Sequence, residues 1–102
     1  MNKPDNWILL RMPEDSEYKD EFKVLGGWSG GYLDGDSWKL NSGIERYSEE
    51  GDYINFYGFS GSCYKCHKDS EQVRMNIAGI LSTLEEKGFR QISYKEFKNA
   101  QD

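Results

Sequence analysis

The amino-acid sequence has little proline, cysteine and histidine, and it contains no long apolar run. A membrane-spanning helix needs about 20 consecutive apolar residues. The longest run here is Trp-Ile-Leu-Leu, from Trp7 to Leu10, so a protein that crosses a membrane by a helix is excluded. The first residues also lack the apolar segment behind a basic start that marks a secretory signal. We therefore expect a cytoplasmic protein that makes no contact with membranes.

The chain has a single histidine, His67, and this limits its enzyme chemistry. A nucleophile activated by a base would need His67 to serve Cys63, Cys66 or a serine that no motif identifies. Pairs of carboxylates occur only in acidic stretches that have the composition of solvated surface. We therefore expect neither an enzyme nor a bound cofactor.

Positive charge is scarce in the first half of the chain. Residues 1–52 hold 12 Asp and Glu against 6 Lys and Arg, whereas residues 53–102 hold 6 against 7, and the net charge is −5. Binding of DNA or RNA needs clustered Lys and Arg, so direct nucleic-acid binding is not expected. An acidic surface would suit a partner with a basic surface, although small soluble domains commonly carry a net charge of this size.

Apolar residues make up only 36% of the chain, but 15% of its residues are aromatic. Large rings supply much of the area that a core buries, and disordered segments contain few of them. A length of 102 residues is enough for one compact domain and too short for two. We therefore expect one ordered domain over residues 1–102.

Five glycines lie between Gly26 and Gly35, which raises the question of a phosphate-binding loop. The segment contains neither GxxxxGK[ST] nor GxGxxG, and no basic residue falls between Val24 and Trp38. The glycines are therefore expected to serve tight turns, with Asp34 and Gly35 as the candidate hairpin.

Short segments of alternating hydrophobicity predict an antiparallel meander. The expected strands are residues 7–12, 37–40, 44–47, 53–57, 63–66 and 89–92. The pattern over residues 13–25 leaves two possibilities open, a short helix or a loop that leads into a strand at Phe22.

An apolar stripe predicts the main helix over residues 70–87. Asp69 is placed to cap its start, and Gly88 follows its end. Ser93 and Glu96 have the spacing of a capping box, which predicts a short terminal helix. The predicted fold class is α+β, an antiparallel meander of about five strands with the 70–87 helix packed on one face. The expected core comprises Trp38, Leu40, Ile44, Ile54, Phe56, Val73, Ile77, Ile80, Leu81, Leu84 and Ile92.

The segment Cys63-Tyr64-Lys65-Cys66-His67 offers three kinds of chemistry. It matches the CxxCH motif of covalent haem attachment, it could supply three zinc ligands, and a CxxC before a helix is typical of thiol-redox proteins. Haem attachment is disfavoured without an export signal, and zinc lacks a second ligand pair elsewhere in the chain. The competing interpretation is that both cysteines are reduced apolar residues of a half-buried strand.

Two neighbouring motifs support a resemblance to a known group of proteins. Trp38 to Ile44 reads Trp-x-x-x-Ser-x-Ile, and Ser60-Gly61-Ser62-Cys63-Tyr64 follows before the helix. On these motifs, residues 36–69 resemble short accessory proteins of bacteriophages and prophages. In those proteins the positions of Cys63 and Cys66 are usually aliphatic, which favours a core role for both. The resemblance implies no catalytic or binding residue.

We therefore expect a small, acidic, non-enzymatic interaction protein, for example a phage or mobile-element inhibitor or modulator of a host machine that handles nucleic acid or acts in defence. Its partner would be a protein with a basic surface. The predicted partner-binding residues lie on strands 44–47 and 53–57 and on the turn between them; they are Glu45, Glu49, Glu50, Asp52, Tyr53 and Tyr57. Tyr53, Asn55 and Tyr57 should point away from the core, because side chains alternate along a strand. The alternative is a thiol-redox or metal-binding protein that uses Cys63, Cys66 and His67.

Overall fold

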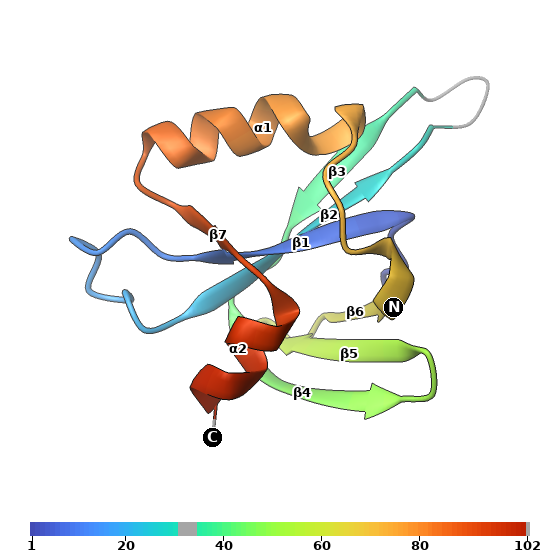
Figure 1. The fold of residues 1–102 in the computed structure, drawn as a ribbon, viewed down its shortest axis with the longest axis horizontal. Coiled ribbons are helices and arrows are strands. Elements are labelled where there is room, and N and C mark those ends of the chain that lie inside the picture. The colour runs from blue at the N-terminus through green and yellow to red at the C-terminus, as the bar shows by residue number, and fades with distance from the viewer. Residues whose placement is uncertain (31–34, 102) are drawn as a thin grey trace.

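The computed structural model describes residues 1–30 and 35–101 of the chain. Within these residues the fold is α+β, with seven strands in two antiparallel sheets and two α-helices, as Figure 1 shows. In chain order the elements are β1 (Asn6–Arg11), β2 (Phe22–Trp28), β3 (Ser37–Leu40), β4 (Ile44–Glu50), β5 (Tyr53–Gly58), β6 (Cys63–His67), a 3₁₀ helix (Lys68–Ser70), α1 (Met75–Glu86), β7 (Arg90–Ile92) and α2 (Tyr94–Gln101). The predicted fold class is confirmed. The predicted hairpin at Asp34 and Gly35 lies partly outside the described residues.

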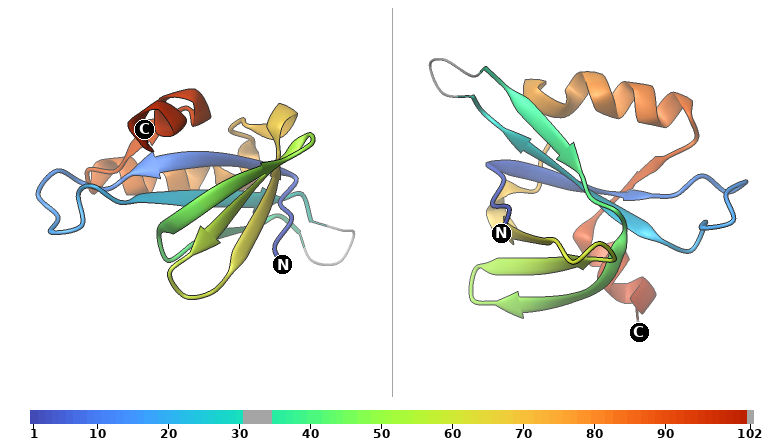
Figure 2. Two further views of the ribbon diagram at one scale, coloured as in Figure 1. Left: turned by 90° about the horizontal axis from the view of Figure 1, so that it is seen from below. Right: turned by 180° about the vertical axis from the view of Figure 1, so that it is seen from behind.

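The strands divide into a four-stranded sheet of order β3-β2-β1-β7 and a three-stranded sheet of order β4-β5-β6. Figure 2 shows the three-stranded sheet lying across the four-stranded one rather than continuing it. The chain changes sheet between β3 and β4, at residues 41–43. There the Asn41 side chain accepts a hydrogen bond from the Val24 N–H at 2.8 Å, and Gly43 takes a φ of 131° that favours glycine.

Of the two possibilities for residues 13–25, a short helix or a loop, the structure shows the loop. Residues 14–20 form turns, and β2 begins at Phe22. β2 pairs with β1 along its length, with Val24 opposite Leu9. β1 is therefore a central strand, and its two faces enter different parts of the core. Trp7 and Leu9 lie between the two sheets, whereas Ile8 and Leu10 face α1.

The main helix starts later than predicted, at Met75 rather than residue 70. Asp69 does not cap it; Asp69 lies in the 3₁₀ helix, and its N–H donates to Nδ1 of His67 at 3.0 Å. The chain after it is held against β1, because the Gln72 N–H donates to the Trp7 carbonyl at 3.0 Å. The residues predicted as the first turn of the main helix thus connect the two sheets. No helix within the described residues is long and apolar enough to cross a membrane.

α1 covers the four-stranded sheet, not the sheet that holds the predicted strands 44–47, 53–57 and 63–66. Its start is fixed by a reciprocal pair of buried amides. Nδ2 of Asn6 donates to Oδ1 of Asn76 at 3.0 Å, and Nδ2 of Asn76 donates to Oδ1 of Asn6 at 2.6 Å. Gly27 makes this approach possible, because a Cβ there would lie 2.7 Å from the Asn76 side chain.

α2 closes the other side of the core and confirms the predicted capping box. Oγ of Ser93 accepts the Glu96 N–H at 3.1 Å, and the Glu96 carboxylate accepts the Ser93 N–H at 3.4 Å. The helix then inserts Phe97, which is 1% exposed, between the two sheets.

Of the eleven predicted core residues, six are buried, three are half-buried and two are exposed. Trp38 is 46% exposed and Val73 is 41% exposed. Trp38 lies on β3, an edge strand whose residues are mostly exposed. Val73 precedes the late start of α1, so it is not on the helix face that packs. Leu40, Ile44 and Ile80 are half-buried.

Candidate functional site

The predicted partner-binding tyrosines lie on the side of the three-stranded sheet that faces away from the core. Ile54 and Phe56 of β5 are fully buried, whereas Tyr53 and Tyr57 are half-buried. The strand register places residues from β4 and β6 beside them. We call this side the outer face; it consists of Arg46, Ser48, Glu50, Tyr53, Asn55, Tyr57, Cys63, Lys65 and His67. The predicted alternation along β5 is confirmed.

Positive side chains cover both tyrosine rings of the outer face. Lys3 and Lys65 place their ammonium groups 4.9 and 5.0 Å from the centroid of the Tyr53 ring. Arg46 lies 3.8 Å from the centroid of the Tyr57 ring. Lys3 reaches this position because the N-terminal segment runs beside β6, where the Asn2 N–H donates to the Cys63 carbonyl at 2.8 Å. The sequence pattern did not identify these cations, since it does not show which strands are neighbours.

Asn55 lies between the two tyrosines and is only 6% exposed. Its Nδ2 makes a long contact of 3.5 Å to Oγ of Ser48, and its Oδ1 has no hydrogen-bond partner in the described residues. A buried acceptor without a partner costs about 1–3 kcal/mol. An unsatisfied amide oxygen is thus buried beneath the outer face, between the two tyrosines.

The four predicted acids do not gather in one patch. The Glu49 carboxylate lies 2.6 Å from Nζ of Lys98 of α2 and 2.9 Å from Nζ of Lys68 of the 3₁₀ helix. Glu50 lies on the outer face, 3.0 Å from Nζ of Lys65. The hydrogen bonds from Lys98 and Lys68 lower the pKa of Glu49 to about 2. Two of the four acids therefore form ion pairs with lysines of the same chain.

The other two acids are exposed and lie apart from each other. Glu45 is at a β-bulge between Ile44 and Arg46, and Asp52 is in the turn before β5. The Asp52 backbone carbonyl accepts the Lys68 N–H at 2.8 Å, which holds the turn without using the carboxylate. Only Asp52 is thus presented by the turn itself, whereas Glu49 and Glu50 belong to β4 and point to opposite faces of it.

The structure does not bring Cys63, Cys66 and His67 together. All three lie on β6, where Cys63 is half-buried on the outer face and Cys66 is fully buried in the core. Three steps along a strand separate Cα atoms by about 10 Å, whereas a disulfide needs them within about 7 Å. Within the described residues, no group of three His, Cys, Asp or Glu side chains is placed to hold a metal ion.

The two thiols should react at very different rates. Burial raises the pKa of Cys66, so its thiolate is scarce, whereas Cys63 is partly open to solvent. Titration of the native protein with a disulfide reagent should show one accessible thiol, and the second should appear only on unfolding. The variant C63S should lose the fast phase and keep the slow one. Two equally fast thiols in the native protein would contradict this assignment and revive a redox role.

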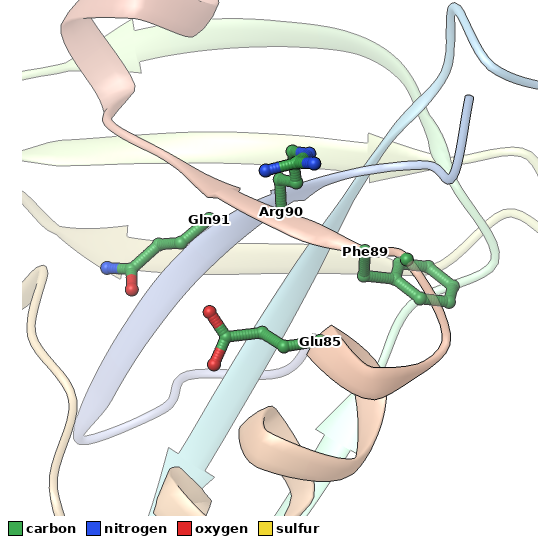
Figure 3. Close-up of a pocket in the computed structure, with 5 residues that line it drawn as sticks. Glu85, Phe89, Arg90 and Gln91 are labelled. Atoms are coloured by element: carbon green, nitrogen blue, oxygen red, sulfur yellow. The ribbon is translucent and has the colours of Figure 1, made fainter.

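A cleft between α1 and β7 is lined by Glu85, Gly88, Phe89, Arg90 and Gln91 (Figure 3). Figure 3 shows Glu85 and Gln91 reaching toward the same opening, with Arg90 directed to the other side of the strand. A lone carboxylate beside an amide provides neither a nucleophile with its base nor an acid–base pair. The cleft therefore supports no catalytic assignment.

Comparisons with known proteins identify no family for this chain: no family model, no curated protein and no solved structure matches it.

Proposed function

We propose that this protein is a non-enzymatic interaction protein that binds a protein partner through the outer face and the acids beside it. The observation that carries the proposal is the pair of half-buried tyrosines, Tyr53 and Tyr57, which β5 presents on the outer face. Tyrosine is a frequent anchor in interfaces, because it offers a large contact area at low entropy cost.

The partner that we propose has a basic surface and is met in the cytoplasm. The net charge of −5 would attract such a surface over a distance, and the exposed carboxylates of Glu45 and Asp52 flank the outer face. Both cysteines are free thiols, which fits a reducing compartment. The same charge disfavours direct binding of nucleic acid.

The resemblance of residues 36–69 to phage and prophage accessory proteins suggests which kind of partner to seek. An acidic protein of this size could occupy the basic surface of a host machine that handles nucleic acid or acts in defence. We propose that it acts there as an inhibitor or modulator.

Affinity capture from a bacterial lysate, followed by binding measurements with the captured protein, tests the proposal. The double variant Y53A/Y57A should bind the partner at least tenfold more weakly, the loss expected when anchor residues are truncated, and its melting temperature should change little by comparison. The matched control is W38A, which removes an exposed aromatic ring from the other sheet. A large loss of stability with unchanged affinity would assign both tyrosines to the fold alone.

The proposed attraction of a basic partner surface is tested in the same assay with the double variant E45K/D52K. This variant leaves the lysine contacts of Glu49 and Glu50 in place. Its association should be slower than that of the wild type at low salt, and the two should converge at high salt. Equal association rates at low salt would remove the basic partner surface from the proposal.

A further inference from the structure

An open cleft lies on another part of the surface, where the β1–β2 loop meets the β5–β6 hairpin. Its volume is about 380 Å³, and it is lined by Met12, Tyr18, Glu21, Lys23, Ser42 and Phe59. This volume falls in the range of about 300–1,000 Å³ that is typical of sites for small ligands. The cleft is lined mainly by apolar surface, whereas the clefts beside Glu85 and beside Arg11 are mainly polar.

Two large aromatic rings form the exposed part of this lining. Tyr18 and Phe59 are each 54% exposed, although they are 41 positions apart in the chain. The Phe59 ring rests on the bare backbone of Gly43, where a Cβ would lie 3.1 Å from it. Exposed rings that converge from separate loops are a feature of binding surfaces more than of ordinary solvated surface.

Hydrogen bonds fix the backbone positions from which both rings extend. The Tyr18 N–H donates to Oγ of Ser16 at 3.0 Å, and the Tyr18 carbonyl accepts the Glu21 N–H at 2.9 Å. The Phe59 N–H donates to the Gly43 carbonyl at 3.1 Å. A preformed site loses less entropy on binding, so its apolar area contributes more to affinity.

The loop beside the cleft is negatively charged, and one of its acids, Glu21, lines the cleft. The loop that carries Tyr18 contains one cation, Lys19, and five acids, which are Glu14, Asp15, Glu17, Asp20 and Glu21. Lys23 also lines the cleft, and its Nζ donates to the Asn41 carbonyl at 3.1 Å. A ligand that enters between the rings therefore meets Glu21 and Lys23 beside an apolar floor, next to a loop that carries four further acids.

We infer that this cleft receives an apolar side chain from a basic segment of the partner, with the ring or aliphatic group between Tyr18 and Phe59 and its flanking Lys or Arg near the acids of the loop. The inference rests on the proposed function and adds a second contact with the same basic partner. The outer face differs in character, since cations already cover its tyrosines. The cleft instead lies beside the acidic loop of residues 14–21, which contains Tyr18 and Glu21 of its lining.

A synthetic peptide tests the inference without knowledge of the partner. The probe is Lys-Lys-Trp-Lys-Lys with both ends blocked, added to ¹⁵N-labelled wild-type protein and followed by NMR. Shifts are expected at residues 12–23, at Ser42 and at Phe59, and the double variant Y18A/F59A should bind at least tenfold more weakly, as for a truncated anchor. Two matched peptides share its length: one replaces tryptophan by alanine, and the other replaces each lysine by glutamate. Both should bind at least tenfold more weakly than the probe.

The variant Y53A/Y57A separates this inference from the proposed function, and it should bind the peptide as the wild type does. Equal binding of the tryptophan and alanine peptides, or shifts confined to the outer face, would overturn the cleft as a site. If Y18A/F59A keeps the dispersed spectrum of a folded protein and binds the peptide fully, the inference also fails. Loss of peptide binding in Y18A/F59A, together with unchanged partner capture by Y53A/Y57A, would support the cleft and overturn the outer face.

Discussion

Alanine in place of Phe97 is expected to destabilise the protein by about 3–5 kcal/mol, the range for deleting a buried aromatic side chain. Phe97 is 1% exposed, and its ring contacts the rings of Phe22, Tyr47 and Phe56 at centroid distances between 5.2 and 5.8 Å. It is the buried residue through which α2 packs on the core. Without it, α2 keeps the ring contacts of Tyr94 with Trp7, Tyr47 and Phe56. Its ion pair at the surface adds little, because exposed ion pairs contribute only about 0–1 kcal/mol each.

The urea concentration at the unfolding midpoint should therefore be much lower for F97A than for the wild type. The melting temperature should fall by roughly 15 °C or more for a domain of this size. Amide exchange in α2 should accelerate first, since the helix loses its anchor while both sheets remain. The matched control is F59A, the same substitution at a ring that is 54% exposed. Equal losses of stability in F97A and F59A would show that the buried Phe97 ring contributes no more to stability than an exposed ring does.

The second large effect is expected at the contact between α1 and the four-stranded sheet. A methyl group at Gly27 would lie within 2.8 Å of three atoms of the Asn76 side chain. That side chain is short, buried and paired with Asn6, so it cannot move aside without breaking two hydrogen bonds. The variant G27A should therefore lose about 1–3 kcal/mol, the usual cost of overpacking a core.

A double-mutant cycle makes this explanation testable. N76A should itself be destabilising by about 1–3 kcal/mol, because it leaves the buried Asn6 amide short of partners. In the N76A background G27A should cost much less, since the clashing atoms are gone, and the two effects should be clearly non-additive. The control G79A lies on the exposed side of α1 with open space around it and should be neutral or stabilising, by up to about 1 kcal/mol. Additive losses at Gly27 and Asn76 would rule out the proposed contact.

Local patterns were sufficient for much of the fold. Alternation along β5 placed Ile54 and Phe56 in the core, and the Ser93 and Glu96 spacing identified the start of α2. These features depend on residues a few positions apart, whose geometry is set by the repeat of one strand or one helical turn. The α+β class followed from the same signals. The failed cap at Asp69 shows the limit, because a hydrogen bond from Gln72 to Trp7 holds that segment against β1 and delays the helix.

For the candidate sites too, some features can be read from the sequence, whereas others depend on the tertiary structure. The residue types, the acidic first half and the single histidine can be read directly from the chain, and the expectations about nucleic acid and catalysis rest on these features alone. Which side chains become neighbours depends on strand pairing over long separations, and this pairing follows from packing the whole core. This packing placed Lys3 and Lys65 over the Tyr53 ring and formed the ion pair between Glu49 and Lys98. It also brought Tyr18 and Phe59 into one cleft, and no local pattern joins two residues on loops that meet only after both sheets have assembled.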